Sequence, residues 1–218
     1  MGWTESAVRW RLASLPASIR SGLALFGRPG SVLLVFDEKR EDLDGHIVRL
    51  FGADCLPRGV IVPQEAVIDS FRVKGWTLAC AESCTGGLLG GVLTSLAGSS
   101  DVFLGSAVCY SNEAKRKVLA VPETTLASFG AVSAETALAM AEGARDLYGA
   151  SLAISVTGIA GPGGGSEDKP VGTVWFGLAR PGACQAVGRL FAGCDRGQVR
   201  SSTVAVALHL LWLCCREE

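Results

Sequence analysis

The feature that most constrains the fold is the alternation of short apolar runs with helical segments between residues 63 and 215. Strand-like runs occur at 76–81, 104–110, 151–156, 171–179 and 184–191. Helices are predicted at 63–74, 88–96, 113–119, 133–148 and 197–215. Such repetition implies right-handed crossovers within a mostly parallel or mixed sheet. We therefore expect residues 59–218 to form a layered α/β domain, with a mixed sheet covered by helices.

The first 58 residues differ in sequence pattern from the rest of the chain, and they predict a separate small α/β unit. Residues 5–15 fit a helix, and residues 31–36 are a strong strand candidate. A charged turn is expected over residues 38–44, before the apolar segment 46–51. The boundary to the main domain is predicted at 57–59, where proline, arginine and glycine follow one another.

Composition excludes several classes of protein. The chain has 20 Lys and Arg against 21 Asp and Glu, which argues against a nucleic-acid partner or an acidic membrane surface. Its longest apolar segment, residues 203–215, is shorter than the roughly 20 residues of a membrane span. Eight cysteines without a C-x-x-C pair, and no secretion signal, indicate reduced thiols in the cytoplasm. With only two histidines and no zinc-ligand spacing, we expect neither a metal nor another cofactor.

Ligands of such sheets collect at the carboxyl ends of strands. Ser83, Tyr110 and Thr157 each follow or close a predicted strand, so they are expected to share one pocket mouth. Ser83 lies on a strand-to-helix turn, where the backbone N–H groups of residues 84–87 would point outward and hold an anion. The alternative is an ordinary serine cap before a helix.

A serine hydroxyl needs a base, and without a suitable histidine the commonest substitute is a desolvated lysine. Lys115 is the best-placed candidate, and burial would lower its pKa. Tyr110 is positioned to pass or orient the proton. The alternatives are a solvated lysine in the first turn of a helix and an aromatic side chain that fills a domain edge.

A glycine-rich loop over residues 157–170 is the second informative stretch. Its glycines allow close approach of a ligand, and Lys169 would add a charge for a phosphate. The loop matches neither the P-loop nor the dinucleotide fingerprint, and a flexible connection is the alternative. Arg196 and Arg200 lie one helical turn apart and fit either an anionic ligand or acidic neighbours. The candidate substrate-binding residues are Cys84, Thr85, Gly86, Gly87, Asn112, Thr157, Gly158, Ala160, Gly161, Lys169 and Arg200.

Four motifs together resemble the carboxyl-terminal domain of the CinA family over residues 62–215. They are Ala81-Glu-Ser-Cys-Thr-Gly-Gly87, Tyr110-Ser-Asn-Glu-Ala-Lys115, Gly130-Ala-Val-Ser-Ala-Glu135 and the stretch from Thr157 to Thr173. Residues 1–58 are faintly similar to the KH-like segment that precedes this domain in longer members. One departure is Cys194, an additional residue before Asp195, which puts Asp195, Arg196 and Arg200 in doubt as ligand contacts.

The resemblance implies a homodimer that hydrolyses nicotinamide mononucleotide to nicotinate mononucleotide and ammonia. It implies Ser83 as the nucleophile, with Lys115 and Tyr110 beside it, and a small nucleotide as the substrate. One alternative is a catalytically silent nucleotide-binding or regulatory module. Another is an RNA-binding front segment, but it has no Gly-x-x-Gly between a pair of helices, so we expect no RNA binding.

Overall fold

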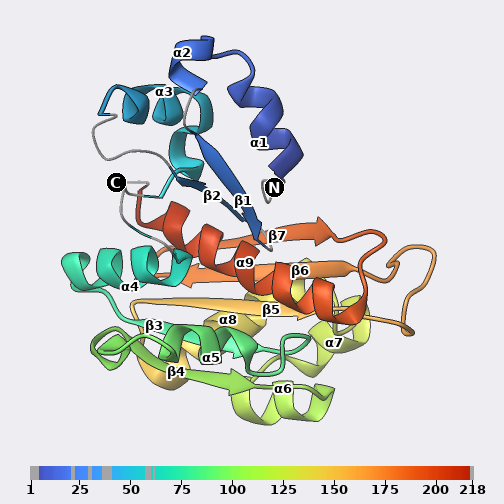
Figure 1. Cartoon of the computed structure of the whole chain (residues 1–218). Coiled ribbons are helices and arrows are strands. Elements are labelled where there is room, and N and C mark those ends of the chain that lie inside the picture. Colours follow the sequence, from blue (N-terminus) through green and yellow to red (C-terminus); the bar gives the residue numbers. More distant parts are fainter. Residues whose placement is uncertain are drawn as a thin grey trace.

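The computed structural model describes residues 5–20, 23–28, 31–35, 41–56, 60 and 62–216. Its main body is a five-stranded mixed sheet in the order β4-β3-β5-β6-β7 (Figure 1). The strands are β3 (Leu78–Glu82), β4 (Phe103–Val108), β5 (Leu152–Gly158), β6 (Thr173–Arg180) and β7 (Ala183–Leu190). Strand β3 is parallel to β4 and β5, whereas β6 is antiparallel to both β5 and β7. The expected layered α/β fold with a mixed sheet is confirmed.

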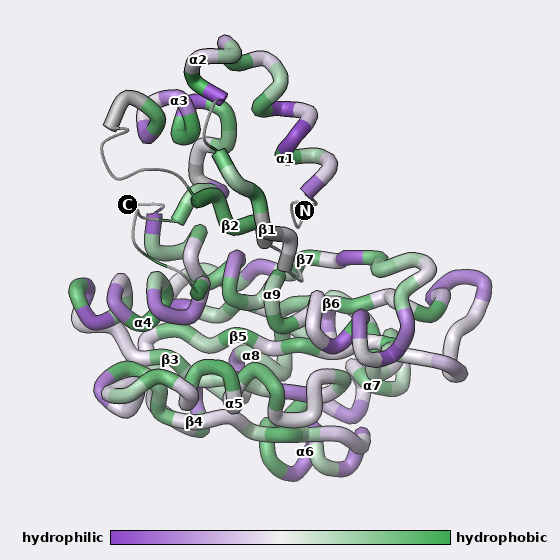
Figure 2. The backbone as a smooth tube through the Cα atoms, viewed as in Figure 1, coloured by the Kyte–Doolittle hydropathy of each residue, from purple (hydrophilic) through white to green (hydrophobic). Residues whose placement is uncertain are grey.

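Helices cover both faces of this sheet and make three layers. One face carries α4 (Pro63–Lys74), α5 (Leu88–Thr94) and α9 (Arg196–Cys214), and the other is covered mainly by α8 (Ala134–Tyr148). The short helices α6 (Asn112–Leu119) and α7 (Glu123–Phe129) pack on α8. Strand β3 is buried along its whole length, and Figure 2 shows β3 and β5 as mainly hydrophobic. Such continuous apolar strands are typical of a sheet covered on both faces.

Local signals account for where the main helices begin and end. Helix α4 has Pro63 at its first position and stops at Gly75, whose φ is 65°. Helix α8 is capped by Ser133, whose side chain accepts a hydrogen bond from the backbone N–H of Thr136. Its buried face includes Met140, as its helical spacing predicts. These helices agree with the sequence prediction almost to the residue.

The front segment forms a separate small cluster above the main sheet in Figure 1. It contains α1 (Glu5–Leu12), α2 (Ala17–Arg20), β1 (Ala24–Arg28), β2 (Ser31–Val35), α3 (Glu41–Phe51) and the short 3-10 helix η1 (Gly52–Asp54). Strands β1 and β2 pair antiparallel, and Val8, Leu12, Leu15 and Phe51 form its small core. The likeness of this segment to a KH unit, and the boundary at 57–59, which lies outside the described residues, stay predictions.

Three local predictions were wrong. Helix α3 begins at Glu41, where the sequence suggested a charged turn, because Leu43, Ile47 and Phe51 recur at helical spacing and bury one face. Ser111, not Asn112, caps α6 by accepting from the N–H of Ala114. Helix α7 occupies the segment after Pro122 for which only a turn was predicted. Within the described residues no helix is long and apolar enough to cross a membrane.

Candidate active site

The carboxyl ends of three parallel strands meet at one edge of the sheet, as expected. Ser83 directly follows β3, and its N–H donates to the carbonyl of Val156 in the neighbouring β5. Tyr110 lies two residues beyond the end of β4, and Thr157 is the penultimate residue of β5. Because β3 lies between β4 and β5, the turn that carries Ser83 is at the centre of this edge.

Ser83 and Lys115 are in direct contact. The Nζ atom of Lys115 is 3.0 Å from the Oγ atom of Ser83, and 2.9 Å and 3.5 Å from the carbonyl oxygens of Cys109 and Tyr110. The lysine is only 1% exposed and the serine 8%. A charged amine would donate to all three oxygens. A neutral amine would keep two N–H donors for the carbonyls and use its lone pair to accept the Ser83 proton.

Burial lowers the pKa of Lys115 from its ordinary value of 10.5, because water no longer stabilises the charged form. Among the described side chains, no carboxylate forms an ion pair with this lysine that would restore its charge. The neighbouring thiols of Cys109 and Cys84 oppose the lowering only when they are ionised. Burial raises both thiol pKa values, that of Cys84 to about 11, so both groups are neutral at neutral pH. Burial therefore shifts the equilibrium of Lys115 toward the neutral amine, which is the form that can act as a base.

Glu82 is a residue of this edge that sequence reasoning missed. Its carboxylate is completely buried. One oxygen accepts from the N–H groups of Gly87 (2.9 Å) and Leu89 (3.1 Å), and the other accepts from the N–H of Gly90 and the hydroxyl of Ser106, both at 2.8 Å. The start of α5 thus already holds an anion, which belongs to the protein itself. The only sequence signal was an acidic residue closing an apolar strand just before a glycine turn.

Of the backbone N–H groups of residues 84–87, which the sequence suggested would point outward, fewer are therefore available to a ligand. Gly86 donates to the carbonyl of Ser83 at 3.1 Å, and Gly87 donates to Glu82. The N–H groups of Cys84 and Thr85 have no backbone or oxygen acceptor in the described part of the chain, and both lie within reach of the Cys84 sulfur, a weak acceptor. The N-cap of α5 is Gly87, so Ser83 is not a helix cap.

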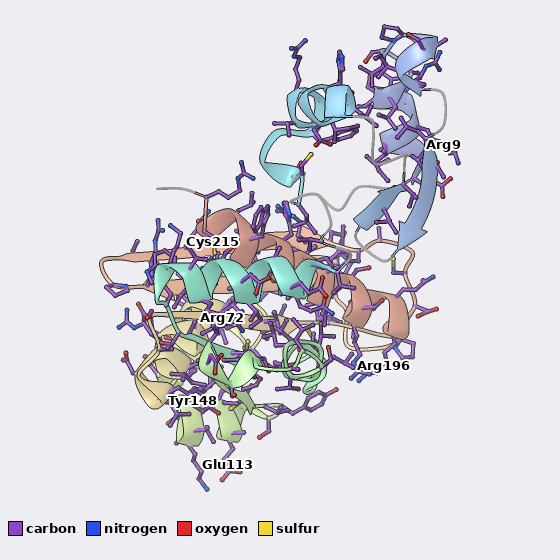
Figure 3. The ribbon with its side chains drawn as sticks, turned by 60° about the vertical axis from the view of Figure 1, so that its left-hand side comes forward. Arg9, Arg72, Glu113, Tyr148, Arg196 and Cys215 are labelled. Carbon is purple, nitrogen blue, oxygen red and sulfur yellow. The ribbon has the colours of Figure 1, made fainter. Side chains whose placement is uncertain are left out.

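Tyr110 lies at the rim, with its side chain 61% exposed. Its phenol oxygen accepts a hydrogen bond from the Nη2 atom of Arg196 at 2.9 Å, while only its backbone carbonyl is near Lys115. Arg196 also donates to the carbonyl of Gly161 at 2.9 Å, so it joins the tyrosine to the glycine-rich loop. In Figure 3, Arg196 and Cys215 mark the two ends of α9, and the arginine is at the end nearer the site.

The glycine-rich loop is tied to the turn before α8. The Thr157 hydroxyl donates to the carbonyl of Ala131 at 2.6 Å, and the Lys169 amine donates to the carbonyl of Phe129 at 2.8 Å. A Cβ atom on Gly158 would lie 2.8 Å from the carbonyl oxygen of Thr173, and Ala160 is buried in the core. Thr157 and Lys169 thus tie the loop to this turn, Gly158 and Ala160 are closely packed, and Gly161 supplies the carbonyl that Arg196 binds.

The remaining candidates have distinct surroundings. Asn112 is exposed at the first position of α6. Arg200 donates through Nε to the carbonyl of Cys84 at 3.2 Å and through Nη2 to that of Thr85 at 2.7 Å. The Thr85 hydroxyl is buried and finds no partner among the described residues. Cys194 packs against the core and leaves the cap of α9 intact, since Asp195 and Gln198 form a capping box.

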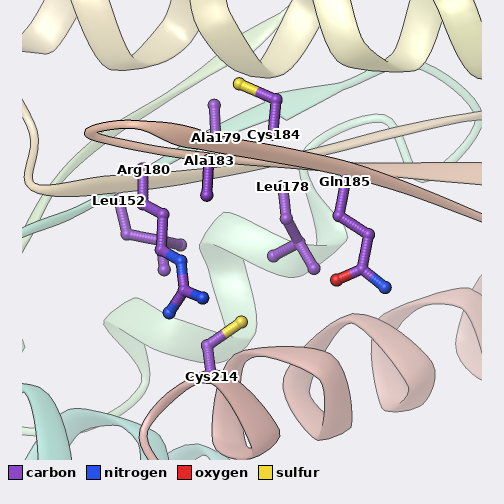
Figure 4. Close-up of a pocket in the computed structure, with 8 residues that line it drawn as sticks. All are labelled: Leu152, Leu178, Ala179, Arg180, Ala183, Cys184, Gln185 and Cys214. Carbon is purple, nitrogen blue, oxygen red and sulfur yellow. The ribbon is translucent and has the colours of Figure 1, made fainter. Parts of the chain in front are cut away.

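A small pocket lies at the opposite end of the sheet. It has a volume of about 40 Å³ and is lined by residues that include Leu152 at the start of β5 and Cys214 near the end of α9 (Figure 4). This is room for about a water molecule rather than a nucleotide. In the described part of the chain, no group of three or more His, Cys, Asp or Glu side chains is arranged to hold a metal.

Comparison with known proteins agrees with this architecture. A family model described as the CinA C-terminal domain matches residues 62–215. A CinA-like protein of Geobacter metallireducens is 51% identical over 174 residues, which are 80% of this chain and 40% of that protein. A CinA-like protein of Synechococcus is 46% identical over 167 residues, which are 76% of this chain and 40% of that protein. This chain thus spans about 40% of the length of these curated relatives.

A solved structure is similar over the same part of the molecule. The competence/damage inducible protein CihA from Agrobacterium tumefaciens superposes with a TM-score of 0.67 and 44% identity, covering 71% of this chain and 96% of that one. The matched residues 62–215 contain the whole sheet and every candidate site residue. The chain therefore belongs to the CinA family, through a CinA C-terminal domain that carries the site around Ser83.

Proposed function

We propose that this protein hydrolyses the carboxamide of nicotinamide mononucleotide, releasing ammonia and nicotinate mononucleotide. The observation that carries the proposal is the 3.0 Å contact between Ser83 Oγ and a buried Lys115 Nζ whose pKa is lowered. A serine that is hydrogen-bonded to a neutral amine is an activated nucleophile. The four sequence motifs of the family supply the choice of substrate.

In this mechanism Lys115 takes the hydroxyl proton while Ser83 Oγ attacks the amide carbon. The developing oxyanion is held by the N–H groups of Cys84 and Thr85, and removing one such donor typically slows a reaction about 10²–10³-fold. Lys115 returns the proton to the departing ammonia. It then activates the water that releases the acyl group, so one amine serves as base, acid and base in turn.

The rim of the site is proposed to bind the nucleotide part of the substrate. Arg196 is exposed, carries a permanent positive charge and lies between Tyr110 and the glycine-rich loop, so a phosphate is the group that its chemistry suits. Because Arg196 donates to the phenol oxygen, the Tyr110 O–H remains free to donate to substrate. Binding energy gained at this remote end would align the amide with Ser83.

Ammonia release from nicotinamide mononucleotide by the purified protein tests the proposal. Ser83→Ala and Lys115→Met should abolish or strongly reduce release, with a loss of about 10²–10⁴-fold for the missing base. Lys117→Met is the matched control, because Lys117 lies on the same helix but is exposed and paired with Glu113 at 2.6 Å. It should retain the wild-type rate.

The possible results separate the two candidate functions. Undiminished release by Ser83→Ala would refute the serine mechanism. Calorimetric binding of the mononucleotide without hydrolysis by the wild type would instead identify a silent nucleotide-binding module. The proposed homodimer and the cytoplasmic location do not affect this assay.

A further inference from the structure

Arg200 directs its guanidinium at the turn that carries the nucleophile. It lies in the second turn of α9, 117 residues after Ser83 in the sequence, and contacts the two residues that follow this serine. Its Nε donates to the carbonyl of Cys84 at 3.2 Å, and its Nη2 donates to the carbonyl of Thr85 at 2.7 Å. Among the described residues it forms no ion pair with a carboxylate. Both acceptors identified for this arginine are thus backbone carbonyls of consecutive residues.

These two contacts fix the direction of two peptide planes. In a trans peptide, the C=O of one residue and the N–H of the next point in opposite directions. Anchoring the Cys84 carbonyl therefore turns the N–H of Thr85 away from Arg200. Anchoring the Thr85 carbonyl turns the N–H of Gly86 away as well, and that group donates to the Ser83 carbonyl at 3.1 Å. The Thr85 N–H is left without a backbone acceptor.

The other side of the turn is held by the opposite charge. The Glu82 carboxylate accepts from the N–H groups of Gly87, Leu89 and Gly90. An anion thus binds the N–H groups at the start of α5, while a cation binds the carbonyls just before them. The N–H groups of Cys84 and Thr85 belong to the turn that these two side chains hold, and they are the donors available for an oxyanion next to Ser83.

We propose that Arg200 is a positioning residue, which holds the peptides after Ser83 so that the Thr85 N–H faces the reacting carbonyl. Arg200 acts through the backbone and does not contact the substrate, in contrast to the substrate-binding role that the sequence suggested. The inference rests on the proposed function in one respect, namely that the reaction at Ser83 is an acyl transfer.

Steady-state kinetics of Arg200→Lys distinguishes the two roles. Lysine keeps the positive charge, but its compact ammonium group replaces the planar guanidinium that spans two carbonyls. We expect kcat to fall about 100-fold, the lower end of the effect of removing one oxyanion donor, with KM changed less than about threefold. A large rise in KM with an unchanged kcat would overturn the proposal, because it would mean that Arg200 binds substrate.

Arg72→Lys is a matched control. Arg72 also donates its guanidinium to a backbone carbonyl, that of Gly98 at 3.2 Å, but it lies on α4 and pairs with Asp69. This variant should keep both kinetic constants. Arg200→Gln, which retains a single donor nitrogen, provides a second variant if Arg200→Lys is poorly folded. All proteins are compared at a temperature where thermal unfolding shows them to be native.

A fluorophosphonate probe tests the same inference without the nucleotide. Ser83 Oγ forms a bond to phosphorus, the phosphorus–fluorine bond breaks, fluoride leaves, and the serine proton passes to Lys115. Intact mass should show one adduct on the wild type and none on Ser83→Ala. Labelling of Arg200→Lys should be about 100-fold slower, because the phosphoryl oxygen uses the same donors.

The two assays fail in different ways. A wild type that reacts with the probe but releases no ammonia from nicotinamide mononucleotide would refute the proposed substrate. The role of Arg200 would still hold in that case if Arg200→Lys reacts with the probe slowly. Labelling of Arg200→Lys at the wild-type rate would overturn that role. A wild type that the probe does not label at all would also overturn it, because a preformed oxyanion site beside an activated serine must react.

Discussion

Replacing Glu82 with glutamine should destabilise the domain, although the two side chains have nearly the same shape. The carboxylate is fully buried and accepts four hydrogen bonds, two on each oxygen. Glutamine has a single acceptor oxygen, and its NH₂ group cannot accept from a backbone N–H. The least costly arrangement keeps the oxygen on Gly87 and Leu89 and places the NH₂ beside Ser106, whose hydroxyl can turn to accept. The N–H of Gly90 then loses its acceptor.

The magnitude follows from these four bonds. An unsatisfied buried N–H costs about 1–3 kcal/mol. The two bonds that remain on the glutamine oxygen change from charged to neutral, which weakens each by about 1 kcal/mol. Burying a neutral amide instead of a carboxylate recovers part of this sum. We expect a net loss of about 2–4 kcal/mol in the free energy of unfolding, which corresponds to a fall in Tm of about 4–16 °C for a chain of this size.

Urea unfolding followed by tryptophan fluorescence measures this loss. Glu113→Gln is the control, because Glu113 is a 68% exposed carboxylate that pairs with Lys117, and its replacement should change stability by about 0.5 kcal/mol or less. A loss below about 1 kcal/mol for Glu82→Gln would refute the assignment of Glu82 as the anion that satisfies the start of α5.

Three further predictions concern pH and packing. Because the pKa of Lys115 is lowered from 10.5, kcat/KM for ammonia release should rise with pH as the amine loses its proton, and it should level off below pH 10.5. A pH profile that is flat or falls between pH 6 and 9 would contradict this prediction. Gly143→Ala should lower the free energy of unfolding by about 1–3 kcal/mol, since its Cβ would clash with the Leu119 carbonyl oxygen. Gly91→Ala, with nothing within 4 Å of its Cβ, should instead stabilise by about 0.5–1 kcal/mol, and equal urea midpoints for the two variants would argue against this packing. Burial lowers the pKa of His209 below 6.5 despite its 3.0 Å contact with Asp54, and Arg189 opposes its charge. The unfolded chain therefore binds the proton more readily, so the free energy of unfolding should fall as pH drops below 6.5. His209→Gln should weaken this pH dependence in urea unfolding, and an unchanged dependence would count against the prediction.

The fold was predictable where local chemistry and hydrophobic pattern agree. Proline at the first position of α4, serine before α8 and the buried face of α8 each mark an element whose tertiary setting matches its local preference. The start of α6 was predicted one residue late because Ser111 and Asn112 are both good caps, and only the backbone shows which one accepts the bond. In α3 the charges at its start obscured an apolar face that appears only at helical spacing.

The site was predictable in its positions more than in its contacts. Ser83 and Lys115 follow neighbouring parallel strands, so topology alone brings them to one edge, where the structure shows them hydrogen-bonded. The partners of long side chains depend on packing between distant segments. For that reason the sequence did not show that Tyr110 would contact Arg196, or that Lys169 would bind the carbonyl of Phe129.

The titration of the Lys115 amine is the most direct test of the proposed mechanism. Selective ¹³Cε labelling of lysine, with the Lys115 signal assigned by its loss in Lys115→Met, allows its titration to be followed by NMR. We predict that this amine loses its proton below pH 10.5, because the side chain is buried beside Ser83 without an anionic partner in the described structure. A midpoint at or above 10.5 would contradict it, because a permanently charged lysine could not accept the serine proton.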